Sequence, residues 1–242
     1  MLKLTPLCLL VAALGACAGA PGTQPHEMSA TRHEAMAQQA ERGAALHQAQ
    51  YDAGASEKTA HCGRTNFTVA TGVATPACWT STRNPTAEHL EQANELRKVA
   101  AEHRAASQVL RDAEARACVG LSDEDRDMSP FAHREDIATV EPLYANVSSG
   151  KGQYARLRGA VITFRAVPGM TAEWLQRIVN CQLARNAALG HDVPEMPYCP
   201  LVPRGVTATV SPAPAGFAVA VASDDVGTAT EVLRRARTLV TP

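Results

Sequence analysis

Residues 86–118 read TAEHLEQANELRKVAAEHRAASQVLRDAEARAC and carry a heptad pattern. Asn84-Pro85-Thr86 introduces the run and Gly120 is placed to end it, as is typical of the two ends of a helix. Along the run, small and apolar side chains recur at alternating spacings of three and four residues. These positions are Leu96, Val99, His103, Ala106, Leu110, Ala113 and Ala117. The pattern predicts a long helix that packs along one narrow seam.

A second helical pattern precedes this one, from Ser29 to about Tyr51. Ser29 is placed to cap its amino end, and no proline interrupts it. Its predicted seam consists of Met36, Ala40, Gly43, Leu46 and Gln50. Residues 52–83 lose this period and gain Gly, Thr, Ser, Pro and two cysteines, so we expect a long loop there. Two helices joined by one loop pack as an antiparallel hairpin, and short side chains let them approach closely.

The chain changes character after this hairpin. Residues 121–136 are acidic and interrupted by Pro130, and we interpret them as a linker with one helical turn. Beyond them the hydrophobic period falls from about 3.6 to about 2, which indicates strands. Strands are predicted over 137–144, 160–167, 206–210 and 217–222, and helices over 171–189 and 226–240. The order ββαββα predicts an α+β sandwich with a four-stranded, largely antiparallel sheet and two helices on one face.

The amino-terminal residues form a separate pattern. Lys3 precedes an apolar run from Leu4 to Leu14, which is too short to span a bilayer because a spanning helix needs about 20 apolar residues. The run ends in Leu14-Gly15-Ala16-Cys17, which resembles the lipobox of bacterial lipoproteins. The resemblance implies cleavage before Cys17, a diacylglycerol on its thiol and an acylated amino terminus. The alternative is a secretory signal without lipid, and either interpretation exports the chain.

The resemblance also implies a location. Residues 1–16 are then the signal peptide, and residues 17–27, rich in Gly, Ala, Pro, Thr and Gln, a flexible tether between lipid and fold. Two or three acyl chains, at about 0.8 kcal/mol per buried methylene, hold a protein on a membrane. Ala18 in place of aspartate after the cysteine implies sorting to the outer membrane, with the body facing the periplasm. That body comprises a helical hairpin over 28–120, a linker over 121–136 and an α+β domain over 137–242.

Five cysteines remain once the signal peptide and Cys17 are set aside, and an exported chain matures where thiols pair. Local pairing predicts Cys62 with Cys78 and Cys181 with Cys199, each bridge contributing about 3 kcal/mol on the chain-entropy estimate. Cys118 is unpaired in this scheme. Its pairing with Cys181 or with Cys199, as a staple between the two regions, stays open because sequence does not define connectivity.

The histidines of the predicted hairpin form the sharpest candidate site. If the hairpin is symmetric about residue 68, cross-hairpin partners have numbers that sum to 136, so His33 faces His103 and His47 faces His89. Imidazole suits Zn²⁺ and Cu²⁺, and both pairs have carboxylates nearby. Those carboxylates belong to Glu34, Glu88 and Glu102. The alternative interpretation is four boundary or surface histidines without a metal.

Composition and motifs exclude several function classes. The 23 basic and 24 acidic side chains nearly balance, so nucleic acid is not an expected partner. The sequence holds no Gly-x-Ser-x-Gly elbow, no Gly-rich phosphate loop and no His-Glu-x-x-His, so we predict no catalytic residue, no enzyme activity and no cofactor. The favoured function is a non-catalytic binding or structural lipoprotein with another envelope protein as partner. The alternative is a lipoprotein that handles Zn or Cu through the hairpin histidines.

Overall fold

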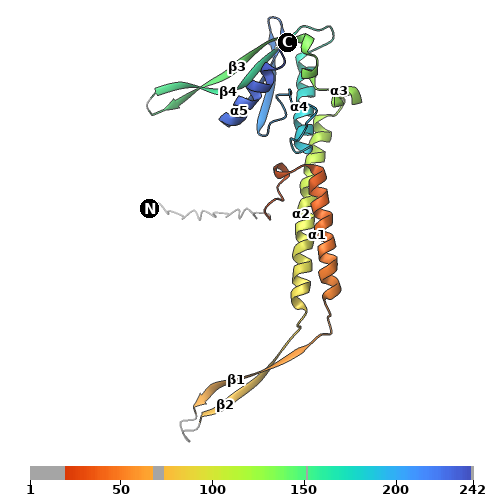
Figure 1. The fold of residues 1–242 in the computed structure, drawn as a ribbon, viewed down its shortest axis with the longest axis vertical. Helices are drawn as coiled ribbons and strands as arrows, with labels where there is room; N and C mark the ends of the chain where they lie inside the picture. Colours follow the sequence, from red (N-terminus) through yellow and green to blue (C-terminus); the bar gives the residue numbers. More distant parts are fainter. Residues whose placement is uncertain (1–19, 68–73, 151, 241–242) are drawn as a thin grey trace, which may run out of the picture.

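The computed structural model describes residues 20–67, 74–150 and 152–240. Three parts follow one another along the long axis of the molecule: a two-stranded ribbon, a hairpin of two long helices, and an α+β head (Figure 1). The predicted fold class is confirmed, because the helical hairpin precedes a four-stranded antiparallel sheet with the order ββαββα. The ribbon and the head lie at opposite ends of the hairpin.

The hairpin packs α1 (Ala30–Gln50) against α2 (Ala87–Ala117) through an alanine seam. Ala37 and Ala93 are completely buried, and Ala100 is nearly so. Gly43 permits the close approach, since a Cβ there would lie 3.1 Å from Cδ1 of Leu96. The seam predicted for α1 is partly wrong, because Leu46 is 68% exposed. The buried positions of α1 are Ala30, His33, Ala37, Ala40 and Ala44.

The stretch expected to be a long loop contains a β-ribbon. Strands β1 (Glu57–Phe67) and β2 (Ala74–Arg83) pair antiparallel, with Cys62 opposite Cys78, and these two cysteines form the predicted disulfide. The loop expectation is wrong because no ribbon residue whose side chain the structure describes belongs to a buried core, and the sequence lacks the apolar alternation of a half-buried strand. An isolated two-stranded ribbon is marginally stable in water, and here the disulfide holds its strands together.

The head contains β3 (Ile137–Ser149), β4 (Gly152–Arg165), α4 (Ala172–Ala188), β5 (Val206–Ala213), β6 (Gly216–Ser223) and α5 (Val226–Arg237). Its strands lie in the order β3-β4-β6-β5. One sheet face packs on both helices: Ile162 and Val219 are fully buried together with Leu175 of α4 and Val232 of α5. The sheet and the two helices therefore share a single hydrophobic core.

The first two strands of the head are longer than the sequence predicted. β6 pairs with β4 only between Gly159 and Arg165, so the rest of the β3–β4 hairpin extends beyond the sheet as an arm (Figure 1). Gly159 lies where β4 leaves the sheet and has φ of +145°. A Cβ at this position would lie 2.0 Å from the carbonyl oxygen of Val221, so only glycine fits there.

Residues 121–136, which we expected to be a linker, pack on the head. They contain α3 (Asp123–Asp127) and the short 3₁₀ turns Pro130–Ala132 and Arg134–Asp136. Phe131 is completely buried, with its ring 5.7 Å from the ring of Phe164. This aromatic contact makes the stretch part of the core.

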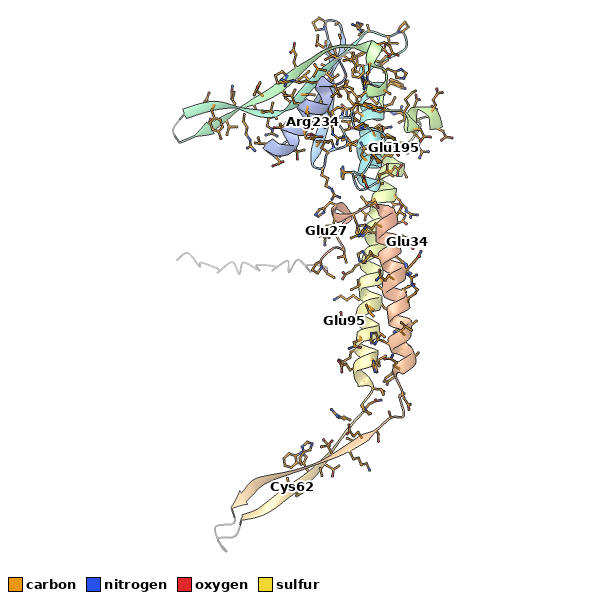
Figure 2. The ribbon with its side chains drawn as sticks, viewed as in Figure 1. Glu27, Glu34, Cys62, Glu95, Glu195 and Arg234 are labelled. Atoms are coloured by element: carbon orange, nitrogen blue, oxygen red, sulfur yellow. A yellow bond between two sulfur atoms is a disulfide. The ribbon has the colours of Figure 1, made fainter. Side chains whose placement is uncertain are left out.

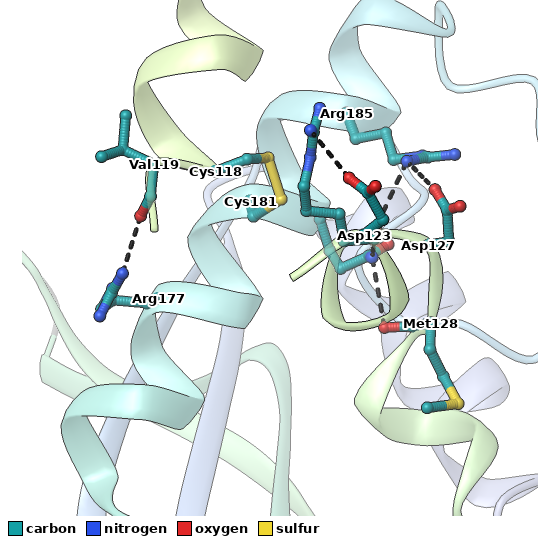
Figure 3. The surroundings of a disulfide bond; sticks show 10 residues. Cys118, Val119, Asp123, Asp127, Met128, Arg177, Cys181 and Arg185 are labelled. Carbon is teal, nitrogen blue, oxygen red and sulfur yellow. Dashed lines mark hydrogen bonds and ion pairs between the residues drawn. A yellow bond between two sulfur atoms is a disulfide. The ribbon is translucent and has the colours of Figure 1, made fainter. Parts of the chain in front are cut away.

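A second disulfide joins the hairpin to the head. Cys118, at the end of α2, bonds to Cys181 of α4 (Figure 3). The predicted Cys181–Cys199 pair is therefore wrong, and of the alternatives left open it is Cys118–Cys181 that forms. Closeness in sequence misled that prediction, because α4 turns Cys181 toward α2 whereas Cys199 is completely buried as a free thiol.

The amino-terminal residues 20–28 lie on the body. The Ala20 amide donates to a Glu102 carboxylate oxygen at 3.0 Å, and Thr23 is buried. A guanidinium nitrogen of Arg204 donates to the carbonyl oxygen of His26. This part of the expected flexible tether is docked by polar contacts that a composition rich in Gly, Pro and Gln did not reveal; residues 17–19 lie outside the described residues.

Candidate functional site

Two histidine pairs cross the helical hairpin. Nδ1 of His33 lies 3.0 Å from Nδ1 of His103, and Nδ1 of His47 lies 3.3 Å from Nδ1 of His89. The structure thus brings together each pair that the symmetric register predicted. At these separations one ring nitrogen of each pair donates a hydrogen and the other accepts it, while Nε2 of His33 is buried without a hydrogen-bond partner among the described residues.

The two pairs differ in burial. His33 and His103 are 0% and 3% exposed and lie near the head, whereas His47 and His89 are partly buried and lie near the ribbon. Burial, and secondly the neighbouring His103, lowers the pKa of His33, while the nearby carbonyl groups of Gln24 and Pro25 act in the opposite direction. Burial therefore favours the neutral form of His33, because a charged imidazole would lose its hydration there.

The glutamates expected near these histidines do not complete a metal site. Among the described residues, no group of three metal-binding side chains includes a hairpin histidine. A Glu102 carboxylate oxygen instead accepts from the Ala20 amide. Figure 2 shows Glu34 and Glu95 on the two helices of the hairpin. Each pair thus supplies two imidazole ligands, whereas protein zinc sites use three or four protein ligands.

The ribbon carries an exposed aromatic side chain that the sequence reasoning missed. Trp79 is 55% exposed and stacks on the ring of His61, with the ring centroids 5.6 Å apart. His61 Nε2 in turn lies 2.7 Å from the Ser81 hydroxyl. The Cys62–Cys78 disulfide lies next to this ring pair, because Cys62 follows His61 and Cys78 precedes Trp79. Figure 2 labels Cys62 on the ribbon. The sequence feature that could have indicated this residue is a tryptophan directly after a cysteine in a Thr-rich stretch.

Hydrogen bonds fix the base of the ribbon to the helices. The Asp52 amide donates to the Thr86 hydroxyl at 3.0 Å, and the Asn84 side-chain amide donates to the Asp52 carbonyl oxygen at 2.7 Å. Arg83 and Glu57 close the first strand pair with an ion pair of 2.8 Å. These contacts brace the base of the ribbon that carries Trp79.

The head contains a cavity of about 550 Å³ between α3, α4 and the proline-rich stretch 191–203. Its wall combines apolar and acidic side chains, and Arg185 in this wall is paired with Asp127 at 2.5 Å. Ser129 also lines it, and its hydroxyl lies 3.6 Å from the Cys199 thiol. Burial raises the pKa of Cys199, which keeps it a neutral thiol and a poor nucleophile.

Comparison with known proteins gives no relative. No family model matches the chain, and no curated protein or solved structure matches it. Within the described parts of the chain, no helix is long and apolar enough to cross a bilayer.

Proposed function

We propose that this protein is a bacterial envelope lipoprotein that acts as a non-catalytic binding and structural module, anchored in the outer membrane through an acylated Cys17. The observation that carries the proposal is the braced ribbon, which presents the exposed Trp79 at the end of the hairpin remote from the head. Large aromatic side chains held on rigid elements are typical centres of protein interfaces. The partner is another protein of the cell envelope.

The hairpin serves as the spacer in this proposal. At about 1.5 Å per residue, a helix as long as α2 spans roughly 46 Å. The Cys118–Cys181 disulfide couples the spacer to the head, and the Asp52, Asn84 and Thr86 hydrogen bonds couple it to the ribbon. A contact made by Trp79 is thereby held at a set distance from the head.

The position of the anchor follows from the docked amino-terminal segment. Ala20 is bound to Glu102 on α2, and Cys17 precedes Ala20 by three residues, which reach at most about 11 Å. A lipid on Cys17 consequently holds this part of α2 close to the bilayer surface. Anchor and ribbon act at different points along one hairpin.

Metal handling by the hairpin histidines is the second candidate function. Two nitrogen ligands of one tetrahedral Zn²⁺ ion, each about 2.0–2.1 Å from the metal, lie about 3.3 Å from each other. The His33–His103 and His47–His89 separations, 3.0 and 3.3 Å, are close to that value. The metal content of untagged protein, compared with that of a variant carrying His33→Ala and His103→Ala, tests this candidate. Stoichiometric metal lost in the variant supports it, and metal-free wild-type protein removes it.

The anchor is tested by intact-mass spectrometry of the membrane fraction. The expected product begins at Cys17 and carries the mass of a diacylglycerol and an amide-linked acyl chain. Cys17→Ser is the matched control, and it should lose both the added mass and the membrane association. An unmodified mature chain in the soluble periplasmic fraction would refute the anchor.

A further inference from the structure

A second group of metal-binding side chains lies in the head, far from the hairpin histidines. It occupies the turn before β3 and contains His133, Glu135 and Asp136. The turn is 3₁₀, with the Asp136 amide donating to the His133 carbonyl oxygen at 3.2 Å. In a 3₁₀ turn side chains three residues apart eclipse one another, which aligns His133 with Asp136. Glu135 folds back, and its Oε1 lies 3.4 Å from Nδ1 of His133.

We propose that His133, Glu135 and Asp136 form a binding site for a divalent transition-metal ion, of which Zn²⁺ fits best. One ligand atom from each residue lies within 4.8 Å of the other two. Three ligands on one Zn²⁺ ion, at about 2.0–2.2 Å, lie no more than about 4.4 Å apart, so small side-chain rotations close the site. The imidazole favours Zn²⁺ over Mg²⁺ and Ca²⁺, which prefer oxygen ligands.

The backbone around this turn is fixed on both sides. Phe131, two residues before His133, is completely buried, and Ile137, directly after Asp136, is 3% exposed. A turn clamped between two core residues loses little conformational freedom when it binds an ion, which is the preorganisation that a metal site needs. The hairpin histidine pairs have a rigid backbone too, but they lack a third ligand.

The neighbouring cations are already engaged. The guanidinium of Arg134 lies over the ring of Tyr198, 5.7 Å from its centroid. Arg165 donates to the carbonyl oxygens of Glu135 and Ile137, so its charge is bonded to the backbone. In the ion pairs of the described residues, the Glu135 carboxylate contacts the His133 ring, the partner with which it would share a metal.

The site is open to solvent. The His133 and Glu135 side chains are 45% and 73% exposed, so an ion reaches them without any opening of the fold. Glu135 also lines a hollow of about 540 Å³ together with Arg134 and Arg165. Three protein ligands leave the fourth position of a tetrahedral Zn²⁺ ion free for water or for a further ligand.

Calorimetric titration of the full mature chain in detergent with ZnCl₂, without an affinity tag, tests the site. Wild-type protein should bind one Zn²⁺ at this position, and His133→Ala should weaken that binding by at least about tenfold, since even outer-shell partners of a metal ligand contribute that much. Asp136→Asn should also weaken Zn²⁺ binding, and it keeps the volume of the side chain. His61→Ala on the ribbon, and His33→Ala with His103→Ala, are the matched controls and should keep the binding.

Two outcomes overturn the site. One is a wild-type chain that takes up no Zn²⁺ at micromolar concentration, and the other is Zn²⁺ uptake that survives both His133→Ala and Asp136→Asn. If Zn²⁺ uptake is lost only in the variant carrying His33→Ala and His103→Ala, the metal site lies in the hairpin and not in the head. The test is independent of the proposed anchor and of the ribbon, because neither residue 17 nor residue 79 contributes a ligand.

Discussion

The two ends of the helical hairpin are built differently. At the head end, a disulfide joins Cys118 to Cys181, and Arg177 donates to the Val119 carbonyl oxygen at 2.7 Å (Figure 3). Between the two helices, the buried Ser107 hydroxyl donates to the Ala30 carbonyl oxygen at 2.9 Å. At the ribbon end, Leu46 is exposed and the connections are hydrogen bonds between polar side chains and backbone. The head end is an extension of a core, whereas the ribbon end is a support for a surface element.

This difference separates stability from function. Disruption of the head end reaches the shared core of sheet and helices and should lower the free energy of unfolding of the whole chain. Disruption of the ribbon end should alter only the shape of a projecting element, because the described contacts that join the ribbon to the helices lie at its base. Binding and folding are therefore expected to depend on different residues.

The largest expected effect comes from the Cys118–Cys181 disulfide. Replacing both Cys118 and Cys181 by serine removes a bridge that closes a sequence separation of 63 residues and should cost about 4 kcal/mol of unfolding free energy, measured by urea titration. The matched control replaces Cys62 and Cys78 by serine, which opens the ribbon. Only a small shift of the global unfolding midpoint is expected there, because the ribbon can open locally without unfolding the core, so that the contribution of about 3 kcal/mol stabilises the ribbon and not the whole fold. An equal loss of stability in both variants would show that the two ends are not independent.

A smaller effect distinguishes the seam of α1 from its exposed side. Ala37 is completely buried against α2, so Ala37→Leu overfills the seam and should cost about 1–3 kcal/mol, measured by the same titration. Leu46→Ala, on the exposed side of α1, should change stability by no more than about 0.5 kcal/mol. Comparable losses in both would contradict the packing of the hairpin.

The lowered pKa of His33 makes the free energy of unfolding depend on pH. Because burial and His103 lower the pKa of His33 in the folded chain, the unfolded chain takes up protons first as the pH falls below about 6.5. The free energy of unfolding should therefore decrease on acidification from pH 7.5 to 5.5. His191, whose pKa burial also lowers, acts in the same direction. His33→Gln should reduce the slope, and an unchanged slope would exclude the pair as its source.

Sequence reasoning worked where one periodicity decided the structure. The heptad spacing of α2 and the symmetric register were sufficient to pair His33 with His103, because a helix repeats its faces regularly. The order of strands and helices in the head followed from the change in period. In both cases an element that buries one face has apolar side chains at a regular spacing, and this spacing identifies the element.

Periodicity did not predict elements that lack a buried face or contacts that depend on the direction of a single side chain. None of the described ribbon side chains is buried in a core, so Trp79 lay in a stretch that we predicted to be a loop. Cys199 lies closer to Cys181 in sequence than Cys118 does, yet the direction of Cys181 on α4 selected the distant partner. The docking of Ala20 on Glu102 depends on a single backbone hydrogen bond that no periodicity records.

Site-specific photo-crosslinking in bacterial cells that express the protein tests directly whether the ribbon is the contact surface of the proposed function. The crosslinking residue replaces Trp79 in one strain and Tyr144, on the arm of the head, in the other; the two side chains are 55% and 57% exposed, so accessibility is matched. We expect a discrete adduct with an envelope protein from position 79, none from position 144, and loss of that adduct when Cys62 and Cys78 are replaced by serine. No adduct at position 79, or the same adducts from both positions, would contradict it.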